Sequence, residues 1–334
     1  MKFGVTLLAD DLGKLGERAR LAEGIGFEYI GVADSQSLFR ELYVSLAVVA
    51  QATNHARIGP TVTNPLTRHS AVTSSAIASI DELSHGRAFL GIGSGDSAVL
   101  NLNLRPARMS QVKEYVQAVR THLSGDSYSY QGRDTHGRWA DAPVPILMAA
   151  EGPRTLKLAG EIADAVLVHT GLTPDILRRS ISLIREGEAD AGKPVGSVEI
   201  WAFAKCNVAN DQETAIQEIK MALAASGHHA FRYTLEGKHV PEELHEAVAV
   251  LQRDYVPVEH EQLGHTRNAT LSDELGLTDF LADRFAVVGT PDQCREKVRG
   301  IPEAGVDVLL ATAIGPQPDV IIERFGREVA ALSG

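Results

Sequence analysis

The sequence is poor in the features that mark several other classes of protein. It has only two cysteines, Cys206 and Cys294, which are too few and too isolated for a disulfide framework or a metal cluster, so we expect no metal and give them no role. No apolar run approaches the roughly 20 residues that a helix needs to cross a bilayer. Met1 leads directly into a strand-like pattern without the apolar core of a signal peptide. These absences predict a soluble, cytoplasmic protein.

Basic charge is also scarce. The formal net charge is −11, and lysine and arginine form no run along the chain. Nucleic acids and anionic membrane surfaces select for clustered positive charge, so we expect neither as a partner. The full glycine spacing of a dinucleotide-binding fingerprint is absent too, and nothing therefore indicates a nicotinamide cofactor.

The chain contains a regular alternation of apolar strand patterns and amphipathic helix patterns. With 334 residues, 44% of them hydrophobic, it is long for an ordinary domain but normal for an α/β barrel. Eight buried-type strands, each needing helices to cover it, favour a closed parallel (β/α)8 TIM barrel, with an open doubly wound sheet as the alternative. We expect the strands at residues 3–8, 29–32, 58–62, 88–92, 145–150, 165–168, 198–204 and 306–310. We expect the helices at residues 12–23, 42–52, 70–83, 110–123, 153–162, 174–189, 291–301 and 320–332.

Two segments interrupt this alternation. The first, residues 125–141, is rich in Tyr, Gly, Arg and His, and the second, residues 207–287, separates the seventh and eighth strands. We interpret the second as a mostly helical insertion with helices at residues 212–225 and 241–255. The polar stretch 257–268 that follows is interpreted as a lid or, alternatively, as an oligomer contact.

Residues 58–97 form the most informative stretch, because they predict one βαβ unit with a polar loop after each strand. Pro65 forces a turned backbone after the first strand. After the second strand, Gly93, Ser94 and Gly95 allow a ligand to approach the backbone, and Asp96 and Ser97 add polar side chains. Glycines in this pattern also occur in plain turns, so the loops alone do not identify a ligand.

Five motifs in this order give the chain a family resemblance. They are VADS at 32–35, TVTNPLTRHSAV at 61–72, DELSHGRAFLGIGSGDSAV at 81–99, AAEGPRTLKLAGEIADAV at 149–166 and VVGTPDQCREKV at 287–298. The chain resembles the bacterial luciferase-like superfamily of flavin- and deazaflavin-dependent oxidoreductases, especially its methylenetetrahydromethanopterin reductase-like branch. The resemblance implies a single barrel domain over residues 1–334, a cofactor at the carboxyl ends of the strands, and a homodimer.

The resemblance also implies a set of cofactor-binding residues. Thr61 and Val62 would form a non-proline cis peptide under the ring system, and Thr63 and Asn64 would bind the ring edge. A phosphate would be held by backbone N–H groups at the helix that starts near Pro153. The remaining expected cofactor contacts are Gly93, Ser94, Gly95, Asp96, Ser97, Glu151, Gly152, Arg154, His169, Thr170 and Gly171, with Arg105 and Arg108 near an anionic group.

Three residues are candidates for catalysis: Asp34, Asn64 and His69. Asp34 ends the second strand, where it either positions substrate or caps the next turn. A lone histidine before a helix, such as His69, is more often structural than catalytic. Related deazaflavin enzymes often carry His after the aspartate, whereas this chain has Ser35, which favours the flavin branch.

The sequence therefore predicts a flavin-dependent oxidoreductase, specifically an FMN-dependent monooxygenase that takes reduced flavin from a separate reductase and reacts it with oxygen. The redox chemistry would belong to the cofactor, and the protein would supply orientation and exclusion of water. One alternative is a deazaflavin-dependent reductase or dehydrogenase that transfers hydride. A second alternative is a noncatalytic flavin-binding barrel. The small organic substrate is not identified by any motif.

Overall fold

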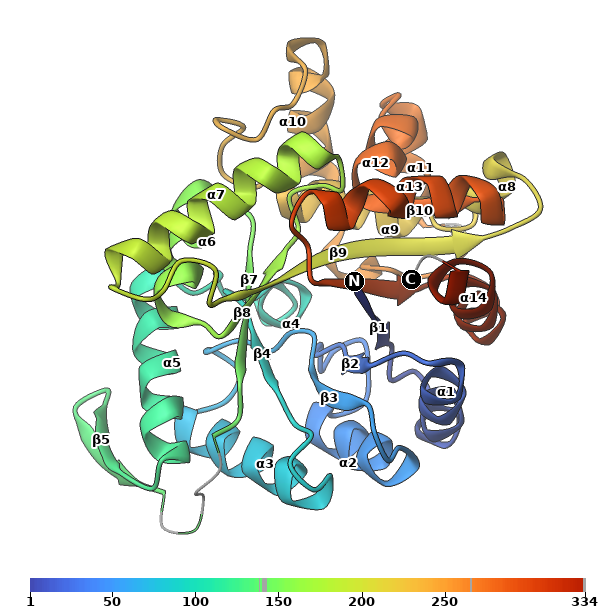
Figure 1. The fold of residues 1–334 in the computed structure, drawn as a ribbon. Helices are drawn as coiled ribbons and strands as arrows, with labels where there is room; N and C mark the ends of the chain where they lie inside the picture. Colours follow the sequence, from blue (N-terminus) through green and yellow to red (C-terminus); the bar gives the residue numbers. More distant parts are fainter. Residues whose placement is uncertain (138, 140–142, 265, 333–334) are drawn as a thin grey trace.

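Eight parallel strands form a barrel in the computed structural model, which describes residues 1–137, 139, 143–264 and 266–332 (Figure 1). The hydrogen-bonded order is β3-β2-β1-β11-β9-β8-β7-β4, and bridges from Ile58 to Ala88 and from Thr63 to Ile92 bring β3 beside β4. This confirms the predicted TIM barrel. The strands are β1 (Lys2–Leu7), β2 (Tyr29–Val32), β3 (Arg57–Pro60), β4 (Leu90–Ile92), β7 (Ile146–Ala150), β8 (Ala165–Val168), β9 (Glu199–Val208) and β11 (Val308–Ala313).

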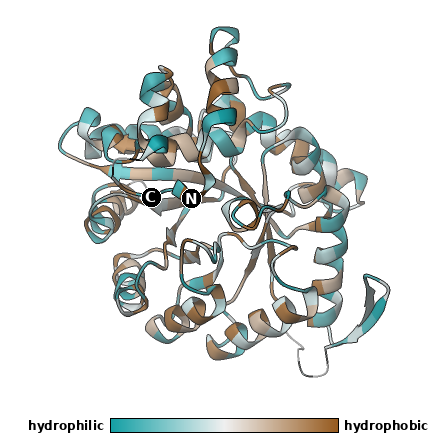
Figure 2. Cartoon of the chain, turned by 180° about the vertical axis from the view of Figure 1, so that it is seen from behind, coloured by the Kyte–Doolittle hydropathy of each residue, from teal (hydrophilic) through white to brown (hydrophobic). Residues whose placement is uncertain are grey.

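Helices cover the outside of the barrel, and their apolar faces turn inward toward the strands (Figure 2). Local signals set their ends: the Asp11 carboxylate accepts hydrogen bonds from the first-turn N–H groups of Gly13 and Lys14, and Gly26 ends the same helix at φ 113°. The outer helices are α1 (Leu12–Ile25), α2 (Leu42–Ala52), α3 (Ser70–Leu83), α5 (Met109–Leu123), α6 (Pro153–Ile162), α7 (Pro174–Asp190), α13 (Pro291–Glu303) and α14 (Pro318–Arg324). The last continues into the short turns η3 (Phe325–Val329) and η4 (Ala330–Leu332).

Between β9 and β11 the chain forms a helical subdomain at one end of the barrel, seen in yellow to orange in Figure 1. Its elements are α8 (Gln212–Gln217), α9 (Lys220–Ala230), η1 (Glu242–Leu244), α10 (His245–Asp254), η2 (Pro257–Glu259), α11 (Arg267–Glu274), α12 (Thr278–Phe285) and the strand β10 (Ala286–Gly289). Buried Phe231, Leu251, Leu271 and Phe285 give it a core of its own. The sequence patterns predicted helices at residues 212–225 and 241–255 but missed α11, α12 and β10. The strand β10 pairs in parallel with β9.

Residues 125–141 contain a hairpin that the sequence analysis did not predict. Its strands are β5 (Ser127–Tyr130) and β6 (Arg133–His136), joined by Gln131 and Gly132 at φ 52° and 73°. Two left-handed residues make the turn that suits a two-residue hairpin. Residues 138, 140 and 141 of this segment lie outside the described part of the chain.

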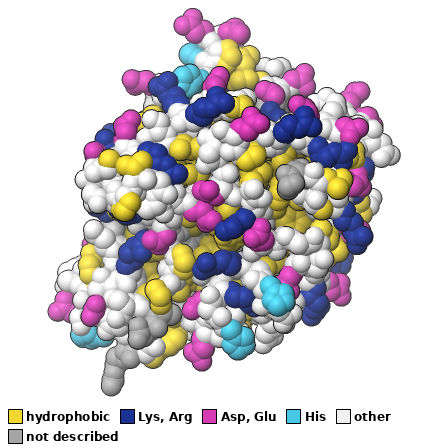
Figure 3. Space-filling model, viewed as in Figure 1, with side chains coloured by type: hydrophobic (Ala, Val, Ile, Leu, Met, Phe, Trp, Pro, Cys, Tyr) yellow, Lys and Arg dark blue, Asp and Glu magenta, His cyan; other side chains and the backbone are white. Residues whose placement is uncertain are grey.

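Aromatic side chains fill the amino-terminal end of the barrel interior. Tyr29, Phe89 and Trp201 pack edge to face, with ring centroids 4.4 Å apart for Tyr29 and Trp201 and 5.4 Å for Phe89 and Trp201. This plug leaves the opposite, carboxyl end of the strands open for a cavity. None of the described helices has the length and hydropathy that a membrane crossing requires. On the surface seen in Figure 3, acidic and basic side chains are interspersed.

Candidate active site

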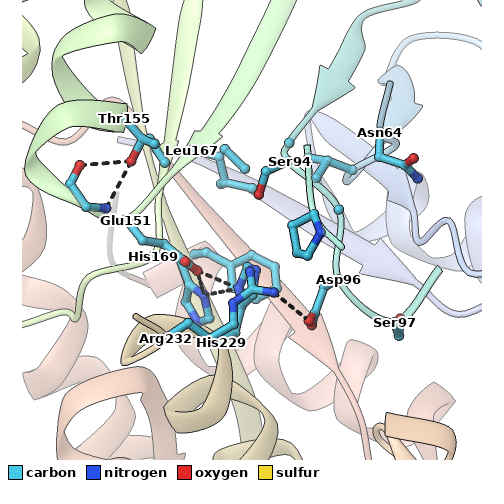
Figure 4. A pocket seen from close by; sticks show the side chains of 18 of the residues that line it. Asn64, Ser94, Asp96, Ser97, Glu151, Thr155, Leu167, His169, His229 and Arg232 are labelled. Atoms are coloured by element: carbon cyan, nitrogen blue, oxygen red, sulfur yellow. Dashed lines mark hydrogen bonds and ion pairs between the residues drawn. The ribbon is translucent and has the colours of Figure 1, made fainter. Parts of the chain in front are cut away.

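A cavity of about 1600 Å³ opens at the carboxyl ends of the strands. Its walls contain most of the residues that the sequence singled out, and Figure 4 shows a part of it. The lining includes Asp34, Thr61, Val62, Thr63, Asn64, Gly93, Ser94, Gly95, Asp96, Ser97, Arg105, Arg108, Glu151, Gly152, Pro153, Arg154 and His169. The topology thus brings four of the five sequence motifs to one site, as parallel strand ends in a barrel do.

The first wall begins at the end of β3, where the peptide bond between Thr61 and Val62 is cis. The expectation of a cis peptide at this position is therefore confirmed. The Thr61 hydroxyl lies 3.0 Å from the hydroxyl of Thr6 on β1, and both side chains are buried. The Val62 side chain faces the cavity beside Gly93, where an added Cβ would lie 3.1 Å from a Val62 methyl group. The backbone around Val62 thus forms a close-packed, apolar surface.

Asp34 is the centre of a polar cluster behind this surface. Its carboxylate accepts hydrogen bonds from the Thr63 hydroxyl at 2.6 Å and from the two terminal nitrogens of Arg68 at 2.7 and 3.3 Å. The Asp34 side chain is only 1% exposed, and Arg68 also pairs with the more exposed Glu41 at 2.9 Å. A bidentate arginine compensates the buried charge, so this cluster fixes the loops after β2 and β3 relative to each other.

Asn64 uses its side chain to shape the loop. Its Oδ1 accepts hydrogen bonds from the backbone N–H groups of Leu66 at 2.9 Å and Thr67 at 3.0 Å, which closes a turn around Pro65. Because the carbonyl oxygen is engaged, only the Asn64 amide nitrogen is left to face a ligand. The structure gives Asn64 a positioning role at the cavity edge.

The loop after β4 depends on a glycine for its conformation and on serine hydroxyls for its position. Gly95 has φ 100°, and a Cβ there would lie 2.4 Å from a methyl group of Val99, so only glycine fits without rearrangement. The short helix α4 (Ser97–Leu100) follows, and the Ser97 hydroxyl donates to the hydroxyl of Ser35 at 3.0 Å. Ser35 therefore ties the loop after β2 to the loop after β4.

The second wall contains a carboxylate between two imidazoles. Glu151 Oε1 lies 3.0 Å from His169 Nδ1 and 2.5 Å from His229 Nδ1, on α9 (Figure 4). Burial opposes ionisation of Glu151, but the two histidines outweigh it and hold the Glu151 pKa well below its usual range. Burial against Phe203 and Phe285 lowers the pKa of His169. Since a carboxylate only accepts hydrogen bonds, both Nδ1 atoms donate to it.

Asp96 faces this wall from the opposite loop. Its Oδ1 accepts a hydrogen bond from Arg232 at 3.1 Å, as Figure 4 shows, and His260 Nδ1 lies 3.9 Å from its Oδ2. Burial would raise the Asp96 pKa, but the nearby His229, Arg232 and His260 lower it to about 2. Asp96 is therefore a carboxylate held by a cation, and it links the barrel to the helical subdomain.

A second buried ion pair joins the same two parts of the molecule. Lys205 on β9 pairs with Glu261, which follows η2, and each side chain is only 6% exposed. Burial opposes ionisation of Glu261, yet Lys205 lowers its pKa below the usual value. Glu261 and His260 lie in the stretch 257–268, so part of that stretch faces the cavity, while residue 265 is outside the described chain.

The outer edge of the cavity is rich in positive charge. Arg105, Arg108, Arg154 and Arg179 line the cavity, and all four are exposed. Within the described part of the chain, none of these four arginines forms an ion pair with a cavity-lining carboxylate, whereas Asp34, Asp96 and Glu261 are each paired with a basic side chain. We call these four residues the rim arginines. They can bind an anion without first breaking an ion pair.

Three predicted site residues lie elsewhere. His69 is exposed, caps α3 by accepting the Ala71 N–H at 3.2 Å, and packs against Tyr130, so the proposed catalytic role is not compatible with its position outside the cavity lining. Thr170 bonds Ser180 at 2.8 Å, and Gly171 packs against Arg284. Neither Thr170 nor Gly171 lines the main cavity.

At the amino-terminal end of α6, the hydrogen bonds differ from the expected phosphate site. The Gly152 N–H, expected to bind phosphate, donates to the Thr155 hydroxyl at 3.0 Å, and that hydroxyl donates to the Gly152 carbonyl at 2.8 Å (Figure 4). A Cβ on Gly152 would meet only this hydroxyl, at 3.6 Å. The protein itself therefore does not require glycine at this position.

Sequence reasoning missed several cavity residues on the second wall. These residues are Arg179, Lys205, His229, Arg232 and Lys238. His229 and Arg232 lie near the end of α9, which the sequence analysis ended at residue 225, and Lys205 lies one residue beyond the expected seventh strand. An HHxxR pattern at 228–232 was the one available signal, since it places polar groups on a helix rich in alanine.

Comparisons with known proteins identify the family of the chain. Residues 1–308 match the family described as luciferase-like monooxygenase. The chain is 29% identical to the 5,10-methylenetetrahydromethanopterin reductase of Methanopyrus kandleri over 98% of this chain and 97% of that protein. It is 30% identical to the enzyme of the same name from Archaeoglobus fulgidus, over 98% of each.

Solved structures of related proteins have the same fold as this chain. The structure of the coenzyme F420 dependent tetrahydromethanopterin reductase from Methanopyrus kandleri superposes with a TM-score of 0.81 at 26% identity, covering 100% of this chain and 99% of that one. The monooxygenase RslO1 of Streptomyces bottropensis, at 18% identity, has a TM-score of 0.69 over 100% of both chains and shows the shared fold alone. The chain therefore belongs to the luciferase-like monooxygenase family and is an oxidoreductase enzyme.

Proposed function

We propose that this protein is a deazaflavin-dependent oxidoreductase that transfers a hydride between coenzyme F420 and a small organic molecule. The observation that carries the proposal is the full-length similarity, at 29% and 30% identity, to reductases of which one solved relative is titled F420-dependent. The monooxygenases among the similar structures are below 25% identical and support the fold alone. The FMN monooxygenase expected from the sequence is thus the less supported reading.

Ser35 was the residue that favoured FMN, and its contacts weaken that argument. Its hydroxyl accepts a hydrogen bond from Ser97 and the residue is 3% exposed, so Ser35 connects two loops at the cavity wall. A serine with this structural function is compatible with either cofactor. Without FMN, no separate flavin reductase is needed as a partner.

The cavity residues fit a deazaflavin. The volume of about 1600 Å³ accommodates a tricyclic ring, a ribityl chain and part of a tail, with space for a substrate. The apolar surface at Val62 suits one face of the ring, and Gly93 to Gly95 allow close approach of the ribityl chain. The rim arginines suit the anionic tail, because they carry free positive charge at the entrance.

The protein residues would orient and enclose this group, and the deazaflavin would supply the hydride chemistry when bound. Asp34, Thr63 and Arg68 hold the loop that carries Val62. Glu261 draws residues 257–264 over the cavity through Lys205, and we propose that this segment acts as a lid that excludes water. Asp96 and Arg232 close a second connection to the helical subdomain.

Equilibrium titration with coenzyme F420 and with FMN, each oxidised and reduced, tests the proposal. We expect F420 to bind at least tenfold more tightly than FMN, a difference of about 1.4 kcal/mol. The triple variant R105A/R154A/R179A provides the matched test, because it removes rim charge without touching Val62. Tighter binding of reduced FMN than of either F420 form would reject the proposal.

A further inference from the structure

The proposed hydride chemistry needs a proton-transfer group that the cofactor does not itself supply. When an alcohol is oxidised by hydride loss, the O–H proton must leave as the carbonyl forms, and a neighbouring base receives it. Each of three cavity carboxylates is already paired with a cation: Asp34 with Arg68, Asp96 with Arg232 and Glu261 with Lys205. A carboxylate held in this way is a weak base, so these three are poor proton acceptors.

His229 differs from these groups. Its side chain lines the cavity, is 26% exposed, and uses only Nδ1 in the hydrogen bond to Glu151. No described residue bonds its Nε2. An ionised partner at Nδ1 fixes the imidazole in the tautomer whose Nε2 carries a free lone pair. His229 therefore presents an unshared base to the cavity, and a carboxylate orients it; His260, whose Nδ1 bonds the Tyr255 hydroxyl, and the exposed Glu236 are other lining bases.

His169 completes the arrangement on the buried side of Glu151. Its Nδ1 donates to the same oxygen, while its Nε2 is buried without a partner among the described residues. Burial lowers the pKa of His169. Glu151 is thus contacted by His169 on its buried side and by His229 on the cavity side. This matches the general pattern of a base oriented by a carboxylate.

We propose that His229, oriented by Glu151, is the acid–base residue of this oxidoreductase and that its substrate is an alcohol, or the corresponding carbonyl compound in reverse. This inference rests on the proposed function. In the forward direction, the electron pair of the carbinol C–H bond leaves as hydride to oxidised F420. The O–H bond breaks, its electron pair forms the carbonyl double bond, and its proton goes to His229 Nε2. Glu151 is a positioning residue, since it acts through His229.

A metal ion is the competing explanation for the same three side chains. Ligand atoms of Glu151, His169 and His229 lie within 4.8 Å of one another, close enough to surround one ion. A metal would take the Nδ1 atoms and displace their protons. The hydrogen-bonded arrangement explains the short distances without an ion, and the unpartnered, buried Nε2 of His169 agrees with a proton on its Nδ1.

The first test requires no turnover. Nitrogen-15 NMR of the imidazole rings in the ligand-free protein reports which nitrogen of each neutral histidine carries the proton. We expect a protonated Nδ1 for both His169 and His229, and a mixture of tautomers for His229 in Glu151→Gln. A protonated Nε2 on His229 in the wild type would overturn the proposal, as would one tightly bound equivalent of zinc in the purified protein.

The second test measures the hydride step. Reduction of protein-bound F420 is followed with isopropanol, cyclohexanol and benzyl alcohol for the wild type, His229→Ala and Glu151→Gln, with exposed His55→Ala as the control. We expect His229→Ala to slow reduction about a hundredfold or more, with partial rescue by added imidazole, and Glu151→Gln to slow it about tenfold. His55→Ala should match the wild type. His229→Asn, which keeps a donor for Glu151, replaces the alanine variant if that one does not fold.

The outcomes separate the two proposals. If F420 binds equally to the wild type and His229→Ala but no alcohol reduces it in the wild type, the alcohol assignment is wrong while the cofactor proposal stands. The assignment of His229 as the acid–base residue would be overturned by an unchanged rate of F420 reduction in His229→Ala. A larger loss of rate in His260→Asn than in His229→Ala would also overturn that assignment. If F420 does not bind at all, the proposed function fails, and the tautomer measurement still decides whether Glu151 orients His229.

Discussion

The two walls of the cavity are built in different ways. On the first wall, Asp34, Thr63 and Asn64 bond residues within 34 positions of themselves, and the loops after β2, β3 and β4 hold one another. Contacts to the helical subdomain join partners that are far apart in the sequence: Asp96, in the loop after β4, meets Arg232 of the second wall 136 positions away, and Lys205 meets Glu261 across 56. The first wall is a self-contained scaffold, whereas the second depends on how the helical subdomain is seated.

This difference suits the two walls to different functions, one for the cofactor and one for the substrate. A rigid wall suits a cofactor ring, whose position must be held closely for hydride transfer. A wall carried by a separate packed unit can move as that unit moves, which suits substrate entry and closure. The comparison predicts that damage to the first wall lowers global stability, while damage to the second wall mainly loosens the helical subdomain.

The largest effect is expected from Arg68→Met on the first wall. It leaves the Asp34 carboxylate, 1% exposed, without its cation, which costs about 3–5 kcal/mol of unfolding free energy. Urea denaturation measures the loss. Glu41→Gln is the control, since Glu41 is 47% exposed and its ion pair with Arg68 contributes less than about 1 kcal/mol. Equal losses in the two variants would contradict the scaffold role of Asp34.

On the second wall, Glu261→Ala should leave Lys205 buried without a partner and cost about 3 kcal/mol locally. Hydrogen exchange should speed up in α10 and α11 while the barrel strands stay protected. The double variant Lys205→Met/Glu261→Leu should recover much of the protection, because it removes both charges. Faster exchange throughout the barrel would remove the distinction between the two walls.

Acid should weaken the second wall through Asp96. Its pKa is lowered from 3.8 to about 2, so its contribution to stability is fully present above pH 3.8 and is lost as the pH falls through about 2. The lost contribution amounts to about 2 kcal/mol. Asp96→Asn should flatten the dependence of unfolding free energy on pH in this window. An unchanged slope in Asp96→Asn would show that Asp96 does not depend on Arg232 in the folded state.

The smallest effects belong to the rim arginines. Single substitutions such as Arg105→Ala should weaken F420 binding about two- to fivefold, because exposed charges are strongly screened by water and salt. Raising the ionic strength should reduce the difference from the wild type. Arg120→Ala, which removes a charge outside the cavity lining, is the matched control. A loss that does not change with salt would argue against a purely electrostatic rim.

The contrast between the walls also explains what the sequence could predict. The barrel and the first-wall loops follow from local patterns within single βα units, whereas the cis peptide at Thr61–Val62 was expected from the family resemblance. His69 was misjudged because a helix cap and a ligand contact use the same residue types, and only the fold tells them apart.

The second wall escaped prediction for a different reason. His229 and Arg232 lie on an alanine-rich helix with little amphipathic pattern, and nothing in their neighbourhood signals partners such as Glu151 and Asp96. Contacts of this kind depend on the placement of a whole helical unit against the barrel. The hairpin β5–β6 was missed because its turn, Gln131 followed by Gly132, is not among the common hairpin sequences.

A crystal structure of the protein with oxidised F420 would test the central claim most directly. The account predicts the ring against the surface formed by Val62 and Gly93, the anionic tail among the rim arginines, and the open face of the ring toward His229. A ring bound against the second wall, or a tail directed away from the rim arginines, would contradict it.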